Sequence, residues 1–174
     1  MAEQPPRPHR REEAPTAGPA LDERGTALMA LLADRLATFQ PQTAAVLDEV
    51  VVTVPRERLV EVLELLKGDE QLDFNYLRCL SVVDYKTYFE VVYHLWSLAK
   101  RHKAVVKVRV PYEDAKTPSV IPVYRGADWY EREGHDLFGL MFEGHPNLKP
   151  LLLYEGFDGY PGRKSFPFHE YNEW

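Results

Sequence analysis

A pair of strand-forming segments joined by a short link constrains the fold of this chain more than any other feature. Residues 104–110 alternate between small or branched apolar side chains and a second set that includes Lys107 and Arg109, which is the period of a strand. The preceding segment, Thr87–Leu98, is rich in the aromatic and β-branched residues that strands favour. We therefore predict an antiparallel hairpin that turns across Ala99–Lys103.

Patterns upstream of this hairpin predict helices that back the sheet. Leu28–Phe39 carries a helical stripe of apolar residues, and Val46–Val54 is β-branched and predicts a strand. Pro55 suits the first residue of a helix, in which Leu59–Leu66 keeps helical spacing and Gly68 is the predicted stop. This layout predicts an α+β domain of two layers, a small mixed or antiparallel sheet backed by helices.

Two further segments are less regular. Phe74–Tyr85 fits a helical turn and a strand face equally well, and both assignments stay open at this point. Pro111–Gly126 contains three prolines and shows no period, so we expect a long connection there. With 174 residues the chain can bury one ordinary core, and a single core domain is expected.

A helix is predicted from Asp128 to Gly139, because aspartate caps or charges a first turn and glycine ends a last one. Gly134 lies inside this helix, where a glycine costs roughly 1 kcal/mol relative to alanine. A bare Cα on the apolar stripe lets another backbone or a bulky side chain come close. We therefore expect this helix to be packed on two sides.

Charged side chains form a second stripe on the same helix. Asp128, Arg132 and Asp136 follow one another at spacings of four residues, so one guanidinium can bridge two carboxylates. Glu131 and His135 form a further pair at the same spacing. We expect Arg132 to support assembly rather than chemistry.

Two kinds of chemistry compete with a purely structural role for this helix, and the spacing favours neither. A metal-dependent hydrolase would use Glu131, His135, Asp136 and His145, but a glycine stop and a turn separate the two histidines. Glu131 and Glu133 lie two residues apart on a helix and point in different directions, which does not suit paired acid–base catalysis. We expect no catalytic, cofactor-binding or metal-binding residues, and the hydrolase stays as the competing hypothesis.

Composition limits the cofactors and partners of the chain. Cys79 is the only cysteine, so the chain forms no internal disulfide and holds no iron–sulfur cluster with four thiolates. Neither standard glycine-rich phosphate loop is present in the sequence. The net charge of −6 argues against a nucleic-acid groove, and no apolar run reaches the roughly 18 residues that a membrane-spanning helix needs.

The two ends of the chain differ in composition from the middle, residues 26–140, which is the predicted α+β domain. Residues 1–25 are rich in proline and charge, so we expect a disordered tail, no secretory signal and a cytoplasmic chain. Residues 141–174 hold eight of the 21 aromatic residues among glycines and prolines, which predicts an extended arm whose aromatic side chains are buried either on this domain's own surface or on a partner; we favour docking on a partner, at least in part. In this arm Arg163 and Lys164 lie among aromatic side chains, a setting typical of recognition, and an ordinary surface position is the alternative.

Several ordered sequence blocks resemble one known family. They are Glu131-Arg132-Glu133 with Asp136-Leu137-Phe138-Gly139, then Phe142 with Gly144-His145-Pro146 and Leu148, then Tyr154-Glu155-Gly156-Phe157, and finally Arg163-Lys164 with Phe166-Pro167. At this spacing they closely resemble the C subunit of the proton-pumping NADH-quinone oxidoreductase, the bacterial respiratory complex I, over about residues 46–167. Gly134-His135, Gly162 and Ser165 depart from the pattern of that family.

The resemblance implies a non-catalytic subunit with no redox group of its own. In that family FMN, iron–sulfur clusters and quinone belong to partner subunits, which pass electrons from NADH to quinone and couple this to proton translocation. Members of the family pack beside the quinone-site D subunit and neighbouring iron–sulfur subunits on the cytoplasmic side of the cell membrane, which they meet only through partners. Related subunits occur in membrane-bound hydrogenases, and that alternative stays open.

The resemblance and the helix together also predict which residues contact other subunits. These residues are Glu131, Arg132, Glu133, Gly134, Asp136, His145, Tyr154, Arg163 and Lys164. No nucleic acid is expected among the partners.

Overall fold

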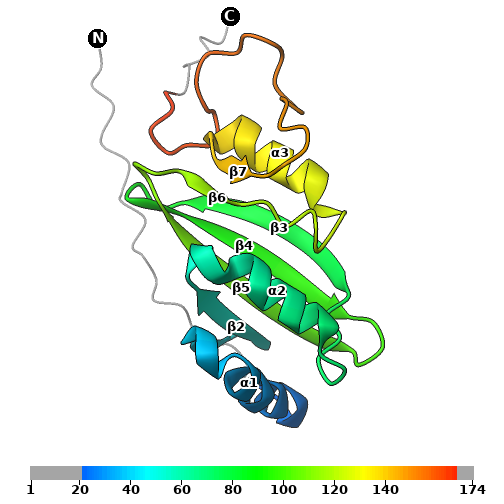
Figure 1. Ribbon diagram of the computed structural model, residues 1–174. Coiled ribbons are helices and arrows are strands. Elements are labelled where there is room, and N and C mark those ends of the chain that lie inside the picture. Colours follow the sequence, from blue (N-terminus) through cyan, green and yellow to red (C-terminus); the bar gives the residue numbers. More distant parts are fainter. Residues whose placement is uncertain (1–20, 168–174) are drawn as a thin grey trace, which may run out of the picture.

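A five-stranded sheet forms the centre of the computed structural model, which describes residues 21–167 (Figure 1). Its strands are β1 (Gln42–Val46), β2 (Glu49–Val54), β3 (Tyr76–Asp84), β4 (Tyr88–Ser97) and β5 (His102–Pro111). They lie in the order β1-β2-β5-β4-β3, and the β2–β5 pair is parallel whereas the other three pairs are antiparallel. The sheet is therefore mixed, as expected.

The hairpin predicted from the sequence is confirmed as the β4–β5 pair. Tyr93 lies opposite Val106 and Ser97 opposite His102, so the two strands pair along their whole length. The segment left open between helix and strand is the strand β3, which pairs with β4. An irregularity between Leu77 and Cys79 interrupts that pairing, which explains why the sequence shows no single period there.

Helices cover one face of this sheet. The helices α1 (Glu23–Arg35) and α2 (Leu59–Gly68) bury apolar stripes in the main core, and α3 (Ala127–Phe138) packs along β3 (Figure 1). The opposite face carries a small separate cluster made of Val51, Val92 and Val105. The two-layer α+β prediction is confirmed. Among residues 21–167, no helix is long and apolar enough to cross a membrane.

The helix α1 begins earlier than the sequence suggested. Asp22 caps it, because its carboxylate Oδ1 accepts a 2.7 Å hydrogen bond from the amide of Gly25. Residues 21–25, which we expected in a disordered tail, therefore belong to the folded domain. The rest of that prediction, residues 1–20, lies outside the described part of the chain.

The strand predicted over Val46–Val54 is wrong in its extent. A turn at Leu47-Asp48 separates β1 from β2, and Leu47 adopts a φ of 56°. Such turns are usually marked by glycine or asparagine, which this chain lacks here. Pro55 precedes a short 3₁₀ turn, Arg56–Arg58, rather than opening α2 itself, and Gly68 is the last residue of α2.

A second, two-stranded sheet lies partly in the segment that we expected to be a plain connection. The strands β6 (Lys116–Pro118) and β7 (Met141–Glu143) pair in parallel. Three-residue strands give no recognisable period, so the sequence pattern missed them. Because α3 lies between them in the chain, this pairing fixes both ends of α3 and positions the start of the C-terminal arm.

Candidate docking site around helix α3

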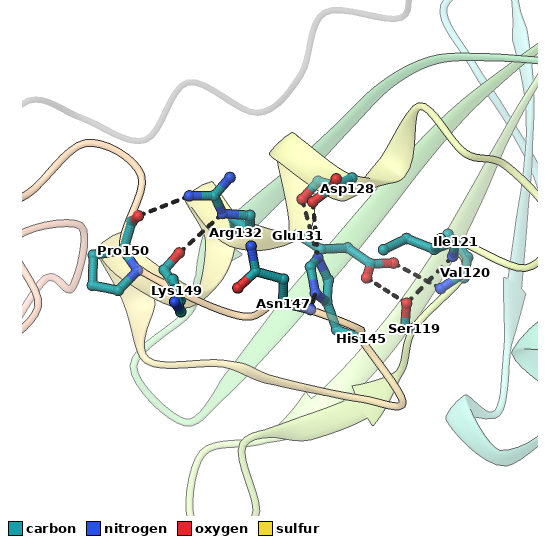
Figure 2. Close-up of polar contacts among 10 residues, drawn as sticks. All are labelled: Ser119, Val120, Ile121, Asp128, Glu131, Arg132, His145, Asn147, Lys149 and Pro150. Atoms are coloured by element: carbon teal, nitrogen blue, oxygen red, sulfur yellow. Dashed lines mark hydrogen bonds and ion pairs between the residues drawn. The ribbon is translucent and has the colours of Figure 1, made fainter.

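The helix α3 has the stop that the sequence predicted but a different start. Gly139 follows it with a φ of 70° and donates its amide to the carbonyl of His135 at 2.8 Å. The residue before the helix is Gly126, and no side chain caps it. Asp128 lies in the first turn and is not the cap; its carboxylate lies 3.3 Å from Nε2 of His145 (Figure 2).

The close approach expected at Gly134 is confirmed. A Cβ atom added to Gly134 would lie 3.0 Å from Cγ2 of Val82 and 3.2 Å from Cε2 of Phe142. These two side chains come from β3 and β7, so α3 is packed between two elements at this residue. Any larger side chain would push the helix away from one of them.

Glu131 is fully buried on the inner side of α3 and binds the segment before the helix. Oε2 of Glu131 accepts a 2.6 Å hydrogen bond from the hydroxyl of Ser119, and Oε1 accepts one of 2.7 Å from the amide of Val120 (Figure 2). Burial raises the pKa of Glu131 to about 7, and the negative charge of Asp128 adds to the increase. Within residues 21–167, no cation pairs with Glu131. Ser119 gave no signal in the sequence.

Arg132 does not bridge the two aspartates on its helix, and that prediction is wrong. Its Nε donates to the carbonyl of Lys149 at 3.0 Å, and its Nη2 donates to the carbonyl of Pro150 at 2.9 Å (Figure 2). The guanidinium therefore binds the backbone of the C-terminal arm. The helical spacing allows an ion-pair bridge between the guanidinium and the two aspartates. The carbonyls of Lys149 and Pro150, farther along the chain, offer the planar guanidinium two acceptors instead.

Asp136 holds the next three residues of the arm. Its Oδ2 accepts hydrogen bonds from the amides of Leu151, Leu152 and Leu153, at 3.0, 2.7 and 2.9 Å. Burial alone would raise the pKa of Asp136, but the three amides and the nearby His135 lower it below its ordinary value. Asp136 is therefore a charged anchor for the backbone of the arm at neutral pH.

Arg163 and Lys164 bind their own domain at the end of the arm. The guanidinium carbon of Arg163 lies 4.5 Å from the ring centre of Tyr160 and within 5.3 Å of two further aromatic rings, and its Nε donates to the carbonyl of Phe138 at 2.7 Å. The amide of Lys164 donates to Asp84 at 2.8 Å. The described part of the arm thus packs back on the domain, while residues 168–174 lie outside the described range.

The structure explains why glycine stands at position 162, one of the departures from the family pattern. Its amide donates to the carbonyl of Leu137 at 2.9 Å, and an added Cβ would lie 2.8 Å from Cζ of Phe138 and 2.9 Å from that same carbonyl. Only glycine fits here without a shift of the arm. Ser165 lies 3.5 Å from the hydroxyl of Tyr112 and has no comparable constraint.

The four side chains of the competing metal site do not come together. Glu131 and Asp136 bind backbone amides as described, and Nδ1 of His135 donates to the carbonyl of Leu140 at 2.8 Å. Nδ1 of His145 accepts from the amide of Asn147 at 3.0 Å, and Nε2 is turned to Asp128. Across residues 21–167, no group of three or more His, Cys, Asp or Glu residues is arranged to hold a metal ion.

Comparison with known families gives the class of this protein. Residues 52–172 match the family described as respiratory-chain NADH dehydrogenase, 30 Kd subunit. The match spans more than half of the chain, so the chain belongs to this family. The resemblance drawn from the sequence blocks around α3 and the arm is therefore confirmed.

Curated relatives make the comparison more specific. The C subunit of NADH-quinone oxidoreductase from Caulobacter sp. (strain K31) is 39% identical over 164 residues, which are 92% of this chain and 74% of the relative. The C subunit of the same enzyme from Maricaulis maris (strain MCS10) is 44% identical over 128 residues, 72% of this chain and 64% of the relative. The chain is thus similar to most, but not all, of each relative.

Solved structures share the fold. The trypsin-resistant fragment (1-134) of Nqo5 superposes with a TM-score of 0.57 at 33% identity, covering 70% of this chain and 98% of that one. A chain of the membrane-bound sulfane sulfur reductase, an archaeal respiratory membrane complex, gives a TM-score of 0.69 at 26% identity and covers 83% of this chain and 86% of that one. The α+β domain is therefore shared with Nqo5 and with a chain of an archaeal respiratory membrane complex.

Proposed function

We propose that this chain is a structural subunit of an NADH-quinone oxidoreductase that holds no redox group itself. In this proposal its partners carry FMN, iron–sulfur clusters and quinone, transfer electrons from NADH to quinone and couple the transfer to proton translocation. The chain contacts the quinone-site D subunit and neighbouring iron–sulfur subunits, and is peripheral to the membrane on the cytoplasmic side. Relatives 39% and 44% identical that are named as C subunits of this enzyme support the assignment.

The observation that carries the proposal is the way in which α3 holds the arm. Arg132 and Asp136 bind carbonyls and amides of residues 149–153, not their side chains. Leu151 and Leu153 in this segment are half-buried, whereas Leu152 is 60% exposed and Tyr154, the residue after the segment, is 72% exposed. Large apolar side chains on a fixed backbone are suited to docking on another protein.

The same geometry opposes an autonomous hydrolase. Glu131, His135 and Asp136 of α3 bind backbone groups of this chain, and Glu131 is fully buried. A general base must reach the proton that it removes, and Glu131 has no path to a substrate in this arrangement. The residues proposed for hydrolysis therefore serve to join α3 to its neighbours.

The choice of parent complex rests on sequence identity. Relatives named for NADH-quinone oxidoreductase are about 40% identical to this chain, whereas the chain from the sulfane sulfur reductase is 26% identical. This difference favours NADH as the electron donor over the donors of related membrane complexes.

The test is purification of the assembled complex from native membranes through a tag on this chain. We expect stoichiometric recovery of flavin-containing and quinone-site subunits, together with NADH:quinone reductase activity. The chain produced alone should show no flavin or iron–sulfur absorption band in the visible spectrum. Recovery of the tagged chain without partners, or a stoichiometric redox band in the isolated chain, would refute the proposal.

A further inference from the structure

A small hollow lies between the C-terminal end of α3 and the arm. It encloses about 140 Å³, several times the roughly 10–15 Å³ that one water needs. The residues that line it are His135, Asp136, Pro150, Leu153, Tyr154, Gly156, Phe157, Gly159 and Tyr160. Three of these nine residues, Tyr154, Phe157 and Tyr160, are aromatic. His135 and Asp136, which carry the titratable groups other than the tyrosines, are consecutive residues of α3.

The aromatic wall of the hollow is held in place by packing within the arm. Tyr154 meets Phe157 edge to face, with ring centres 5.4 Å apart, and Phe157 stacks on Phe166 at 6.0 Å. Tyr154 itself is 72% exposed, so its ring offers a free aromatic face. Such a face attracts a cation through the negative charge density above the ring.

Two hydrogen-bond acceptors complete the lining. Nδ1 of His135 donates to the carbonyl of Leu140, which leaves Nε2 as the acceptor of the neutral ring. All three amides that bind Asp136 reach Oδ2, so Oδ1 has no partner within residues 21–167. The negative end of the α3 dipole lies beside both groups, since His135 and Asp136 are in its last turn.

Arg163 already shows this combination within the described part of the chain. Arg163 lies over the ring of Tyr160 and donates to the carbonyl of Phe138 at the end of α3. The hollow presents the same pairing of aromatic rings and acceptors near the same helix end, and no cationic side chain from residues 21–167 lines it. An excess of acids over bases, a net charge of −6, further favours a positive occupant.

We propose that this hollow receives an arginine side chain from the partner protein that docks on the arm. A guanidinium is planar and has several donors, so it stacks on Tyr154 while it binds both Nε2 of His135 and Oδ1 of Asp136. A lysine ammonium offers no flat face to stack, and an acidic side chain would be repelled by the carboxylate of Asp136. This inference rests on the proposed function, because it requires a docked partner.

The first test measures retention of this chain in the complex, purified through a tag on the quinone-site subunit. Tyr154→Ala should lower the amount retained after a salt wash about tenfold, the effect of losing an aromatic anchor at an interface. Trp129→Ala is the matched control, because Trp129 is a similarly exposed aromatic, 68%, that lies on α3 and outside the hollow. Equal retention of both variants would overturn the inference. Absence of the wild-type chain from the complex would instead refute the proposed function.

The second test asks whether the occupant is arginine. The full chain, labelled with ¹⁵N, is titrated with N-acetyl-arginine amide and, separately, with N-acetyl-lysine amide. The arginine probe should shift the amide signals of Tyr154, Gly156 and Gly159, and the lysine probe should shift them at least threefold less. Asp136→Asn keeps a carbonyl oxygen for the arm amides but removes the charge, so it should weaken the arginine response. No response, an equal response to lysine, or full response of Asp136→Asn would each overturn the proposal.

Discussion

Glu131 shows how far burial can shift the pKa of one carboxyl group. Its carboxylate is fully buried, accepts two hydrogen bonds and has no cation partner in the described part of the chain. A carboxylate in such a place resists ionisation, and burial raises its pKa from 4.5 to about 7. The residue therefore titrates in the physiological range.

We predict that Glu131 makes the stability of the chain fall as pH rises. The folded state holds this proton more tightly than the unfolded state, so the contribution is present near pH 4.5 and is lost as the pH rises through about 7. The free energy of unfolding should fall by about 3 kcal/mol more in the wild type than in Glu131→Gln between these values. Urea unfolding at several pH values measures this. Glu133→Gln, a less buried neighbour, is the control, and equal pH profiles for wild type and Glu131→Gln would contradict the prediction.

The tight packing around Gly134 leads to a second prediction about a single residue. Gly134→Ala should lower the free energy of unfolding by about 1 kcal/mol, because overpacking costs about 1–3 kcal/mol and the gain in helix propensity returns about 1 kcal/mol. The added methyl would lie 3.0 Å from Val82. Gly68→Ala is the matched control, since nothing lies within 4 Å of its added Cβ, and it should be neutral or stabilising. Thermal unfolding of both variants decides the matter, and a stabilised Gly134→Ala would refute the tight contact.

At the scale of elements, α3 and the arm form one unit because side chains of the helix bind backbone of the arm. Asp136→Ala removes the acceptor of three amides, so residues 151–153 should exchange their amide hydrogens at least tenfold faster. The strands of the central sheet should keep their exchange rates, because they make no bond to Asp136. Glu133→Ala on the same helix should leave the arm unchanged. Unaltered exchange of the arm in Asp136→Ala would show that other contacts hold it.

Elements with a strong local pattern could be predicted from the sequence. The β4–β5 hairpin and the stop of α3 at Gly139 follow from period and glycine placement, and both are present. The break between β1 and β2 could not be predicted, because Leu47-Asp48 is an unusual turn sequence. The partners of Arg132 could not be predicted either, since carbonyls distant in the chain leave no trace in side-chain spacing.

The same limit applies to the candidate site as a whole. Sequence patterns placed Gly134, Asp136 and the arm in one region; in the structure Asp136 binds backbone amides of the arm, and Gly134 lets the side chains of Val82 and Phe142 come close to α3. Ser119 was missed because it lies in a segment without a period. Tertiary contacts of this kind depend on how distant parts of the chain fold together. A short segment of sequence does not contain that information.

At the scale of the whole molecule, association with a membrane should depend on partners. Across residues 21–167 no helix is long and apolar enough to cross a bilayer. The chain produced alone should therefore stay in the supernatant when mixed with vesicles of neutral phospholipid and centrifuged. The assembled complex in native membranes is the positive control. Binding of the isolated chain to such vesicles would contradict the assignment of membrane contact to other subunits.

The parallel pairing of β2 with β5 has a consequence for synthesis on the ribosome. The strand β2 lies between β1 and β5, yet β5 is the last strand of the main sheet to be made. At roughly 5–20 residues per second, several seconds pass between emergence of β2 and emergence of its second neighbour. During that interval the valine-rich edge of β2 is open to other nascent chains. Slow translation of residues 55–111 should thus lower the yield of folded protein, and a chaperone that covers β2 should restore it.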